Sequence, residues 1–150
     1  IFKMVSIFVK SYQELSKLEL YKILRLRAEV FVVEQNCVYQ DIDNKDQKAL
    51  HVFLIKSEEI IGYTRLFWPG DYFKQASIGR VVISKKERKN NYGTLLMKAS
   101  INAVSEKMEE NKIKISAQTY LKKFYNNLGF LETGKEYLED GIPHIAMFKE

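Results

Sequence analysis

Short apolar runs alternate along this chain with longer stretches in which apolar residues recur every three or four positions. Short runs rich in β-branched and aromatic side chains predict strands, and the longer spacing predicts helices. We expect strands at residues 5–9, 50–56, 60–68, 76–84, 112–117, 130–137 and 142–149, and helices at 11–35, 91–108 and 119–128. The resulting order, β-α-β-β-β-α-β-α-β-β, predicts a mixed α/β (α+β) fold.

Local signals predict several of the boundaries. Ser11 and Glu14 have the spacing of a capping box, which predicts that the first helix begins there. Gly129 suits the C-terminal cap of the last helix. The charged link at 57–59 predicts a hairpin, a further antiparallel strand is expected after it, and residues 139–141 predict the turn between the last two strands.

The composition describes a chain that can fold into a single domain spanning residues 1–150. It has 150 residues, of which 46% are hydrophobic and 29% charged, in the usual size range of one domain. The chain begins with Ile1 rather than methionine, so whether residues 1–3 are native, added or the remainder of a trimmed start is left open. No apolar run approaches the ~20 residues of a membrane-spanning helix, and no signal peptide is evident, so we expect no membrane partner.

Cysteine usage limits the chemistry further. Cys37 is the single cysteine, so no internal disulfide can form, and a reducing cytoplasm is expected. No activating motif accompanies Cys37, which predicts an inert loop thiol. No Cys/His cluster has zinc spacing, so no metal is expected.

Residues 78–97 carry the most informative pattern: an apolar strand, a basic turn and the opening of an amphipathic helix. The start of a helix has unpaired N–H groups and a partial positive charge, which together bind anions. The net charge is +5, and the alternatives for this turn are a solvated basic surface or a small nucleic-acid-binding domain. Because the basic run lies at a helix start and no nucleic-acid motif is present, we favour an anionic cofactor over nucleic acid.

The hexapeptide from Arg88 to Gly93 resembles the pyrophosphate loop Arg/Gln-x-x-Gly-x-Gly/Ala of the GNAT superfamily of acyl-CoA-dependent N-acyltransferases. Asn91 stands at the first glycine position, and asparagine tolerates a left-handed backbone better than other non-glycine residues. The apolar run at 81–83 and the segment 124–130 are also similar to superfamily motifs. The resemblance covers essentially the whole chain and implies a mostly antiparallel sheet of six to seven strands flanked by about four helices.

Four further blocks, at residues 26–35, 41–43, 78–82 and 140–144, resemble the ElaA-like subfamily, which is predicted to acetylate amines. The resemblance implies an N-acetyltransferase that transfers the acetyl group of acetyl-CoA to a primary amine of an undefined small molecule or peptide. Transfer is expected by direct attack in a ternary complex. The alternative is a noncatalytic acyl-CoA binding or sensor module of the same fold. Relatives are often dimers, so a homodimer is a further expectation.

The resemblance also implies where acetyl-CoA binds. The pantetheine arm is expected beside the backbone of Val81, Val82 and Ile83, which would otherwise be a plain core strand. Lys85 and Lys86 are expected to steer the ligand. Its pyrophosphate is expected on the main-chain N–H groups of Arg88, Lys89, Asn90, Asn91, Tyr92, Gly93 and Thr94, although Arg88 and Lys89 could also be solvated surface.

Proton transfer requires an acid and a base. The resemblance implies that the Tyr125 hydroxyl protonates the departing thiolate, which contributes ~10²–10⁴-fold; the alternative is an aromatic core residue. The attacking amine must be neutral, although a free amine has a pKa of about 10. The candidate bases are Glu34, His51 and His144. Glu34 could instead be an ordinary charge at a helix end, and His51 a core residue with its hydrogen bonds satisfied. His144 could instead make only a structural hydrogen bond.

Arg65 and Arg80 are cations inside apolar strands, and an unpaired buried charge is costly. They are expected either to form internal ion pairs, with Glu29, Glu34 or Asp43, or to bind a carboxylate of the acceptor. Glu34 is also a candidate acceptor contact, because the first helical region lines the acceptor cleft in this fold.

Overall fold

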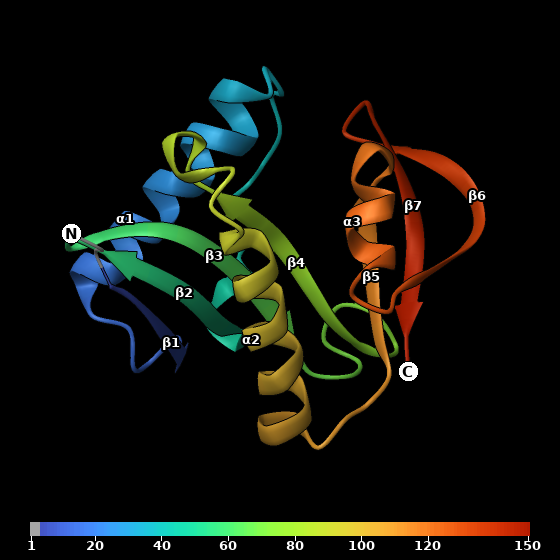
Figure 1. The fold of residues 1–150 in the computed structure, drawn as a ribbon, viewed down its shortest axis with the longest axis horizontal. Helices are drawn as coiled ribbons and strands as arrows, with labels where there is room; N and C mark the ends of the chain where they lie inside the picture. The colour runs from blue at the N-terminus through green and yellow to red at the C-terminus, as the bar shows by residue number, and fades with distance from the viewer. Residues whose placement is uncertain (1–3) are drawn as a thin grey trace.

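The computed structural model describes residues 4–150 and contains one seven-stranded sheet (Figure 1). The strand order is β1-β2-β3-β4-β5-β7-β6, and every neighbouring pair is antiparallel except β4 and β5. The predicted mixed α/β class and order of elements are therefore confirmed. The strands are β1 (Val5–Ser11), β2 (Leu50–Lys56), β3 (Glu59–Phe67), β4 (Ala76–Ile83), β5 (Ile113–Gln118), β6 (Leu131–Glu139) and β7 (Ile142–Lys149).

Helices cover both faces of the sheet. The first helical region is longer than one regular helix, because α1 (Lys17–Arg27) continues into the π-helical segment η1 (Ala28–Glu34). The second long helix is α2 (Tyr92–Met108), and a short helix, α3 (Lys122–Asn126), follows β5. Three 3-10 turns complete the set: η2 (Asp46–Lys48), η3 (Lys85–Glu87) and η4 (Thr119–Leu121).

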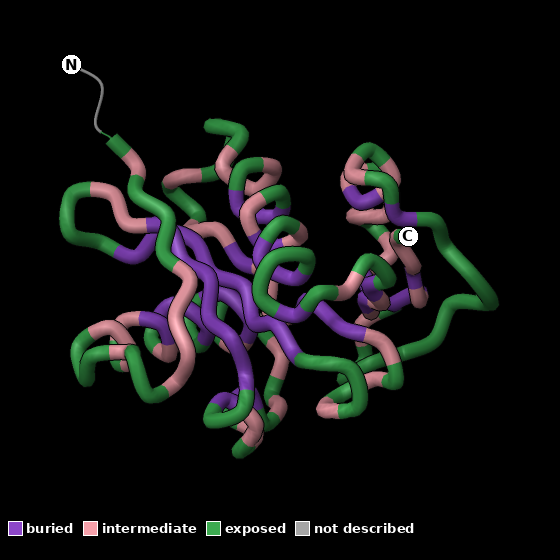
Figure 2. The backbone as a smooth tube through the Cα atoms, turned by 90° about the horizontal axis from the view of Figure 1, so that it is seen from below, coloured by how far each residue is buried: buried purple, intermediate pink, exposed green. Residues whose placement is uncertain are grey.

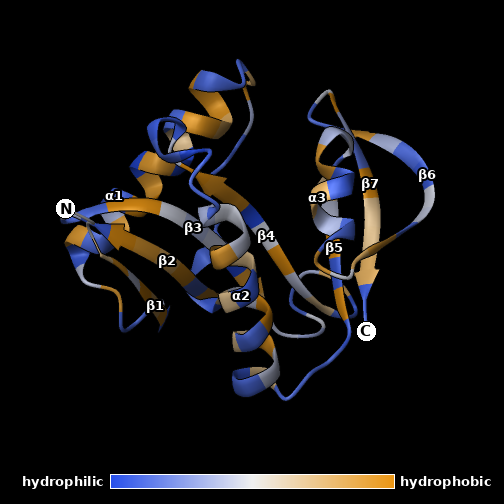
Figure 3. Cartoon of the chain, in the orientation of Figure 1, coloured by the Kyte–Doolittle hydropathy of each residue, from blue (hydrophilic) through white to orange (hydrophobic). Residues whose placement is uncertain are grey.

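Two apolar clusters hold these layers together. Alternate residues of β2 point to opposite faces, so Phe53 packs with α1 and η1 while Val52 and Leu54 pack under α2. β2 is therefore buried on both faces, as its continuous apolar run requires. Figure 2 shows the buried backbone concentrated in these central strands, and Figure 3 shows the apolar residues that α1 and α2 contribute.

The start of the first helix differs from the prediction. Ser11 and Glu14 do exchange the expected hydrogen bonds, but they close a turn directly after β1. The N-cap of α1 is Ser16, which forms its own capping box with Glu19. Ser11 pairs with Leu50 at the end of β1, so strand pairing excludes it from the helix.

β4 and β5 separate soon after they meet. They pair only at Ala76 with Ile113 and at Ser77 with Lys114. Beyond this point β4 contains a bulge, because Gly79 opposes Arg65 while Val82 opposes Tyr63. The bulge bends the strand and leaves a gap in the middle of the sheet.

The C-terminal hairpin lies on the far side of this gap (Figure 1). Asp140 and Gly141 both have positive φ, at 51° and 78°, as a tight two-residue hairpin turn requires. β6 is exposed along its whole length and does not pair continuously with β7 between Thr133 and Tyr137. Among residues 4–150, no helix combines the length and the hydropathy that a bilayer crossing needs.

Candidate functional site

Two adjoining pockets occupy the gap between β4 and β5. The α2 pocket, of about 570 Å³, runs along the end of β4 to the start of α2. The β7 pocket, of about 110 Å³, lies between β4, β5 and the C-terminal hairpin. Gln35, Val81, Gln118 and Tyr125 are among the residues that line both pockets, so the two form one continuous cleft.

The start of α2 presents free main-chain donors to the α2 pocket. Lys89 and Asn91 adopt positive φ, at 74° and 63°, which turns the chain sharply before the helix. Asn91 makes no side-chain cap, and within residues 4–150 the N–H groups of Tyr92, Gly93 and Thr94 donate to no carbonyl or side chain. Three adjacent free donors at a helix start are typical of anion-binding sites.

Arg88 sits at this site but is already paired. Its guanidinium donates to both carboxylate oxygens of Glu34, at 2.6 and 2.9 Å, and its Nε donates to the Ile83 carbonyl at 3.1 Å. The hydrogen bonds from Arg88 lower the pKa of Glu34. Glu34 therefore stays ionised and competes with any other anion for Arg88.

The β4 edge that borders the α2 pocket has no neighbouring strand there. Val82 and Ile83 pair with β3 on one side, and Val81 lies in the bulge, whereas β5 pairs with β4 only at residues 76 and 77. Their main-chain groups on the open side are available to an extended ligand, in the manner of an added strand.

Tyr125 lies where the two pockets meet. Its ring packs edge-on against Phe124 and Phe130, at centroid distances of 5.1 and 6.1 Å, and the residue is 5% exposed. Burial raises the pKa of Tyr125, so its hydroxyl stays protonated at neutral pH. Tyr125 is thus a core residue that also lines the cleft. Its packing in the core does not exclude the expected role as an acid.

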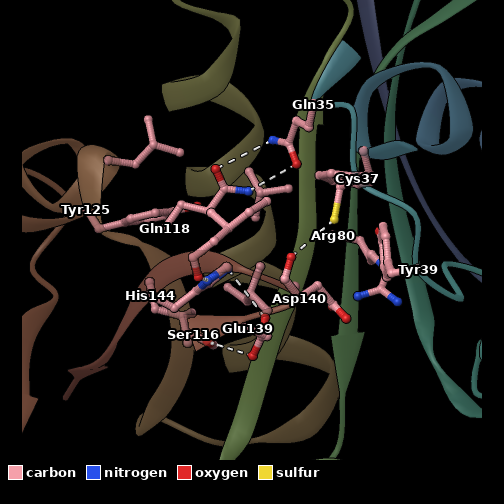
Figure 4. Close-up of a pocket in the computed structure, with 17 residues that line it drawn as sticks. Gln35, Cys37, Tyr39, Arg80, Ser116, Gln118, Tyr125, Glu139, Asp140 and His144 are labelled. Atoms are coloured by element: carbon pink, nitrogen blue, oxygen red, sulfur yellow. Dashed lines mark hydrogen bonds and ion pairs between the residues drawn. The ribbon is translucent and has the colours of Figure 1, made fainter. Parts of the chain in front are cut away.

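His144 lines the β7 pocket and has a defined orientation. Its Nδ1 lies 2.7 Å from the Ile142 carbonyl; a carbonyl only accepts, so Nδ1 carries a proton. The other nitrogen, Nε2, lies 3.4 Å from a carboxylate oxygen of Glu139. Figure 4 shows His144 between Tyr125 and Glu139. The atom of His144 that can accept a proton is therefore Nε2.

Comparisons with known proteins agree with this geometry. The family model described as "Acetyltransferase (GNAT) domain" matches residues 10–150. Protein ElaA of Escherichia coli strain K12 is 38% identical over 141 residues, which are 93% of this chain and 92% of that protein. The chain belongs to the GNAT acetyltransferase family. The predicted resemblance to GNAT proteins, and to ElaA-like proteins among them, is confirmed.

Solved structures extend the comparison to the whole GNAT fold. The crystal structure of Escherichia coli ElaA has a TM-score of 0.92 at 36% identity, covering 98% of this chain and 100% of that one. An acyl-CoA N-acyltransferase from Pseudomonas aeruginosa has a TM-score of 0.91 at 36% identity, covering 97% and 99%. A GNAT acetyltransferase from Elizabethkingia anophelis with acetyl-CoA bound has a TM-score of 0.68 at 17% identity, covering 97% of each chain, and shares the fold.

The structure brings most of the expected GNAT cofactor residues together. Residues 81–83 and 88–94, except Asn90, line the α2 pocket. The Asn90 side chain instead donates to the Glu87 carbonyl at 3.4 Å. Lys85 and Lys86 belong to a separate groove beside α1.

The three candidate bases lie in different places. His144 lines the β7 pocket, and Glu34 lines the α2 pocket, paired with Arg88. His51 is fully buried and lines neither pocket. It bonds the Tyr63 hydroxyl at 2.6 Å and the Asp46 carbonyl at 2.9 Å, and burial lowers its pKa. His51 is thus a neutral core residue out of reach of an acceptor.

Arg65 and Arg80 form internal ion pairs, which was one of the two expectations; the other was contact with a carboxylate of the acceptor. Arg65 bonds Asp43 at 2.8 Å and Asp46 at 2.9 Å, while Arg80 lies 2.8 Å from Asp41 and 3.4 Å from Asp43. Of the expected partners, Asp43 is confirmed. Glu29 and Glu34 are wrong because they pair with Arg25 and Arg88. Arg27, fully buried at the end of α1, was not expected in this network and pairs with Asp41 and Asp46.

This ion-pair network fixes the acidic loop against the sheet and removes Arg65 from the cleft. Arg65 is 1% exposed and lines neither pocket, while Arg80 lines the β7 pocket with its charge already compensated. A carboxylate of an acceptor therefore finds no free arginine among these three.

Four polar residues of the cleft were not foreseen as site residues. Gln35 and Gln118 exchange two long hydrogen bonds of 3.5 Å between η1 and β5. Ser116 and Glu139 line the β7 pocket. The alternation of polar and apolar residues in β5 places Ser116 and Gln118 on one face and could have revealed them, whereas Glu139 showed only a turn signal.

Proposed function

We propose that this protein is an acetyl-CoA-dependent N-acetyltransferase acting on a primary amine. The observation that carries the proposal is the row of free N–H groups at residues 92–94, at one end of a cleft whose other end holds Tyr125 and His144. This arrangement suits a long ligand with a pyrophosphate at one end and a reactive group at the other.

The residues of the α2 pocket fit acetyl-CoA. Main-chain donors at the start of α2, with Arg88 and Lys89 beside them, would hold the pyrophosphate. The open backbone of Val81–Ile83 would pair with the amide-containing pantetheine arm. Acetyl-CoA supplies the thioester, whose carbonyl carbon is the electrophile.

We assign the proton transfers to two residues. His144 Nε2 takes the proton of the acceptor ammonium, directly or through water, which leaves the neutral amine that attacks. Tyr125 donates its proton to the sulfur when the carbon–sulfur bond breaks, and the second proton that the nitrogen loses as the amide forms returns to Tyr125, directly or through water. Burial raises the pKa of Tyr125, so its hydroxyl carries a proton at neutral pH and has one to donate.

Two measurements test the proposal. Calorimetry should detect CoA binding to the wild type that is about tenfold weaker in Arg88→Ala, in line with the loss of a charge-assisted contact to phosphate. Lys98→Ala, which alters an exposed lysine of α2 outside both pockets, is the matched control and should bind normally. Equal binding by all three proteins would contradict the assignment of the anion site.

Turnover separates the enzyme from the alternative. Thiol release from acetyl-CoA should depend on added amine across a panel of primary amines. Tight CoA binding without amine-dependent thiol release would instead indicate a noncatalytic acyl-CoA binding module with the same fold.

A further inference from the structure

The β7 pocket has an excess of negative charge. Its lining includes two carboxylates, Glu139 and Asp140, one arginine, Arg80, and His144. The Arg80 guanidinium is already bound by Asp41 at 2.8 Å and by the Asp41 carbonyl at 3.0 Å. Its charge is compensated within the protein, and the carboxylates of Glu139 and Asp140 dominate what a ligand meets.

Ser116 and His144 hold the Glu139 side chain in place but leave its carboxylate accessible to a ligand. Its Oε1 accepts a hydrogen bond from the Ser116 hydroxyl at 3.1 Å, and its Oε2 lies 3.4 Å from His144 Nε2. The side chain is nevertheless 45% exposed, so a ligand can contact the carboxylate. Figure 4 shows Glu139 pointing toward His144.

His144 provides a second and independent indication of a ligand. It is 6% exposed, and its Nδ1 is committed to the Ile142 carbonyl. Within residues 4–150, Nε2 makes no hydrogen bond, and the Glu139 carboxylate lies 3.4 Å from it. Two acceptors, Nε2 and the carboxylate, thus converge on one point, and a group with several N–H donors and a positive charge satisfies both.

We propose that Glu139 is the residue that selects the acceptor, and that the acceptor is a cationic primary amine with no carboxylate on the adjacent carbon. This inference rests on the proposed function and narrows its substrate class. An ammonium group has three N–H donors and can contact Glu139 and His144 Nε2 together. A carboxylate one carbon away is repelled by Glu139 and Asp140, and the local arginine, Arg80, is occupied.

The test uses two acceptors with the same skeleton, tyramine and tyrosine, which differ only in the carboxylate. For the wild type we expect kcat/KM for tyramine to exceed that for tyrosine by at least about tenfold. Glu139→Gln keeps the size of the side chain and an oxygen for Ser116. It should raise KM for tyramine about tenfold, leave KM for acetyl-CoA unchanged and narrow the preference between the two acceptors. Glu136→Gln, on the same exposed strand outside both pockets, is the matched control and should change neither value.

The outcomes distinguish this inference from the proposed function. Equal or better use of tyrosine, or an unchanged preference in Glu139→Gln, would overturn the role of Glu139 while the acetyltransferase activity stands. If the wild type binds CoA but transfers no acetyl group, calorimetry of tyramine in the presence of CoA tests whether Glu139 binds the acceptor. Tyramine binding that is lost in Glu139→Gln would support the role of Glu139 even though the catalytic proposal has failed. The absence of any tyramine binding to the wild type would overturn the role of Glu139.

Discussion

The Arg88–Glu34 pair leads to the prediction that Glu34→Gln tightens acetyl-CoA binding. Arg88 can bind a phosphate only after it leaves Glu34, to which it makes two short hydrogen bonds. Glutamine removes the charge and most of this competition while keeping the size of the side chain. Arg88 stays beside the α2 pocket in the variant, because its Nε still donates to the Ile83 carbonyl.

The expected size of the effect follows from the exposure of the pair. The Arg88 and Glu34 side chains are 39% and 30% exposed, and exposed ion pairs contribute roughly 0.2–1 kcal/mol. The two-point geometry favours the upper end of this range. About 1 kcal/mol corresponds to roughly a fivefold change in the dissociation constant.

Calorimetry of CoA and steady-state kinetics on the wild type and Glu34→Gln measure this change. We expect CoA to bind about fivefold more tightly while kcat stays within about twofold of the wild type. The double variant Glu34→Gln/Arg88→Ala should lose the gain, because the gain depends on the freed guanidinium. A large fall in kcat with unchanged CoA affinity would refute the reasoning and identify Glu34 as the general base.

Three further predictions concern the acid, the anion site and the buried ion pairs. Tyr125→Phe should lower kcat by ~10²–10⁴-fold with little change in CoA affinity, and an unchanged kcat in the same assay would exclude Tyr125 as the acid. Gly93→Val places a branched side chain beside the free N–H groups of the α2 pocket, so calorimetry should show that CoA binding is lost; normal binding would mean that the ligand lies elsewhere. Arg65→Met removes one of the three arginines that balance Asp41, Asp43 and Asp46, leaves an excess of buried negative charge and should lower the free energy of unfolding in urea by about 3–5 kcal/mol, whereas a loss below 1 kcal/mol would show that Arg27 and Arg80 or water compensate these carboxylates. Burial tends to raise the pKa of Asp43, but Arg65 outweighs burial and lowers that pKa from 3.8 to about 2. The stability that ionised Asp43 contributes is therefore present above about pH 4 and is lost as the pH falls to 2. Urea titrations at several pH values can follow this loss.

Much of the fold could be predicted because its signals are local. Residues 52–55 of β2 form a continuous apolar run, which is typical of a strand buried on both faces. The basic turn before α2 combines Asn91, which can adopt the left-handed backbone, with cations at a helix start. The first helix boundary could not be predicted in this way. Ser11–Glu14 and Ser16–Glu19 are equally good capping boxes, both form their hydrogen bonds, and strand pairing decides which one begins the helix.

The candidate site could be predicted only in part. The residues expected to bind the cofactor form two short runs, 81–83 and 88–94, that are close together in the sequence, which is why nine of the ten line one pocket. The acceptor side is built from η1, β4, β5 and the β6–β7 turn, which are distant along the chain. His144 and Glu139 are five residues apart in a hairpin, and neither carried a signal that they face the same point.

The sequence alone determined the order of strands and helices and marked a helix start where an anion site is expected, because periodicity and helix-start signals act over a few neighbouring residues. Only the tertiary structure decided which charges remain free. The pairing of Arg65 and Arg80 with loop aspartates, and of Arg88 with Glu34, depends on side chains from different elements. A buried charge takes whatever opposite charge the fold brings within reach, and Glu139 and His144 are left facing each other in the β7 pocket.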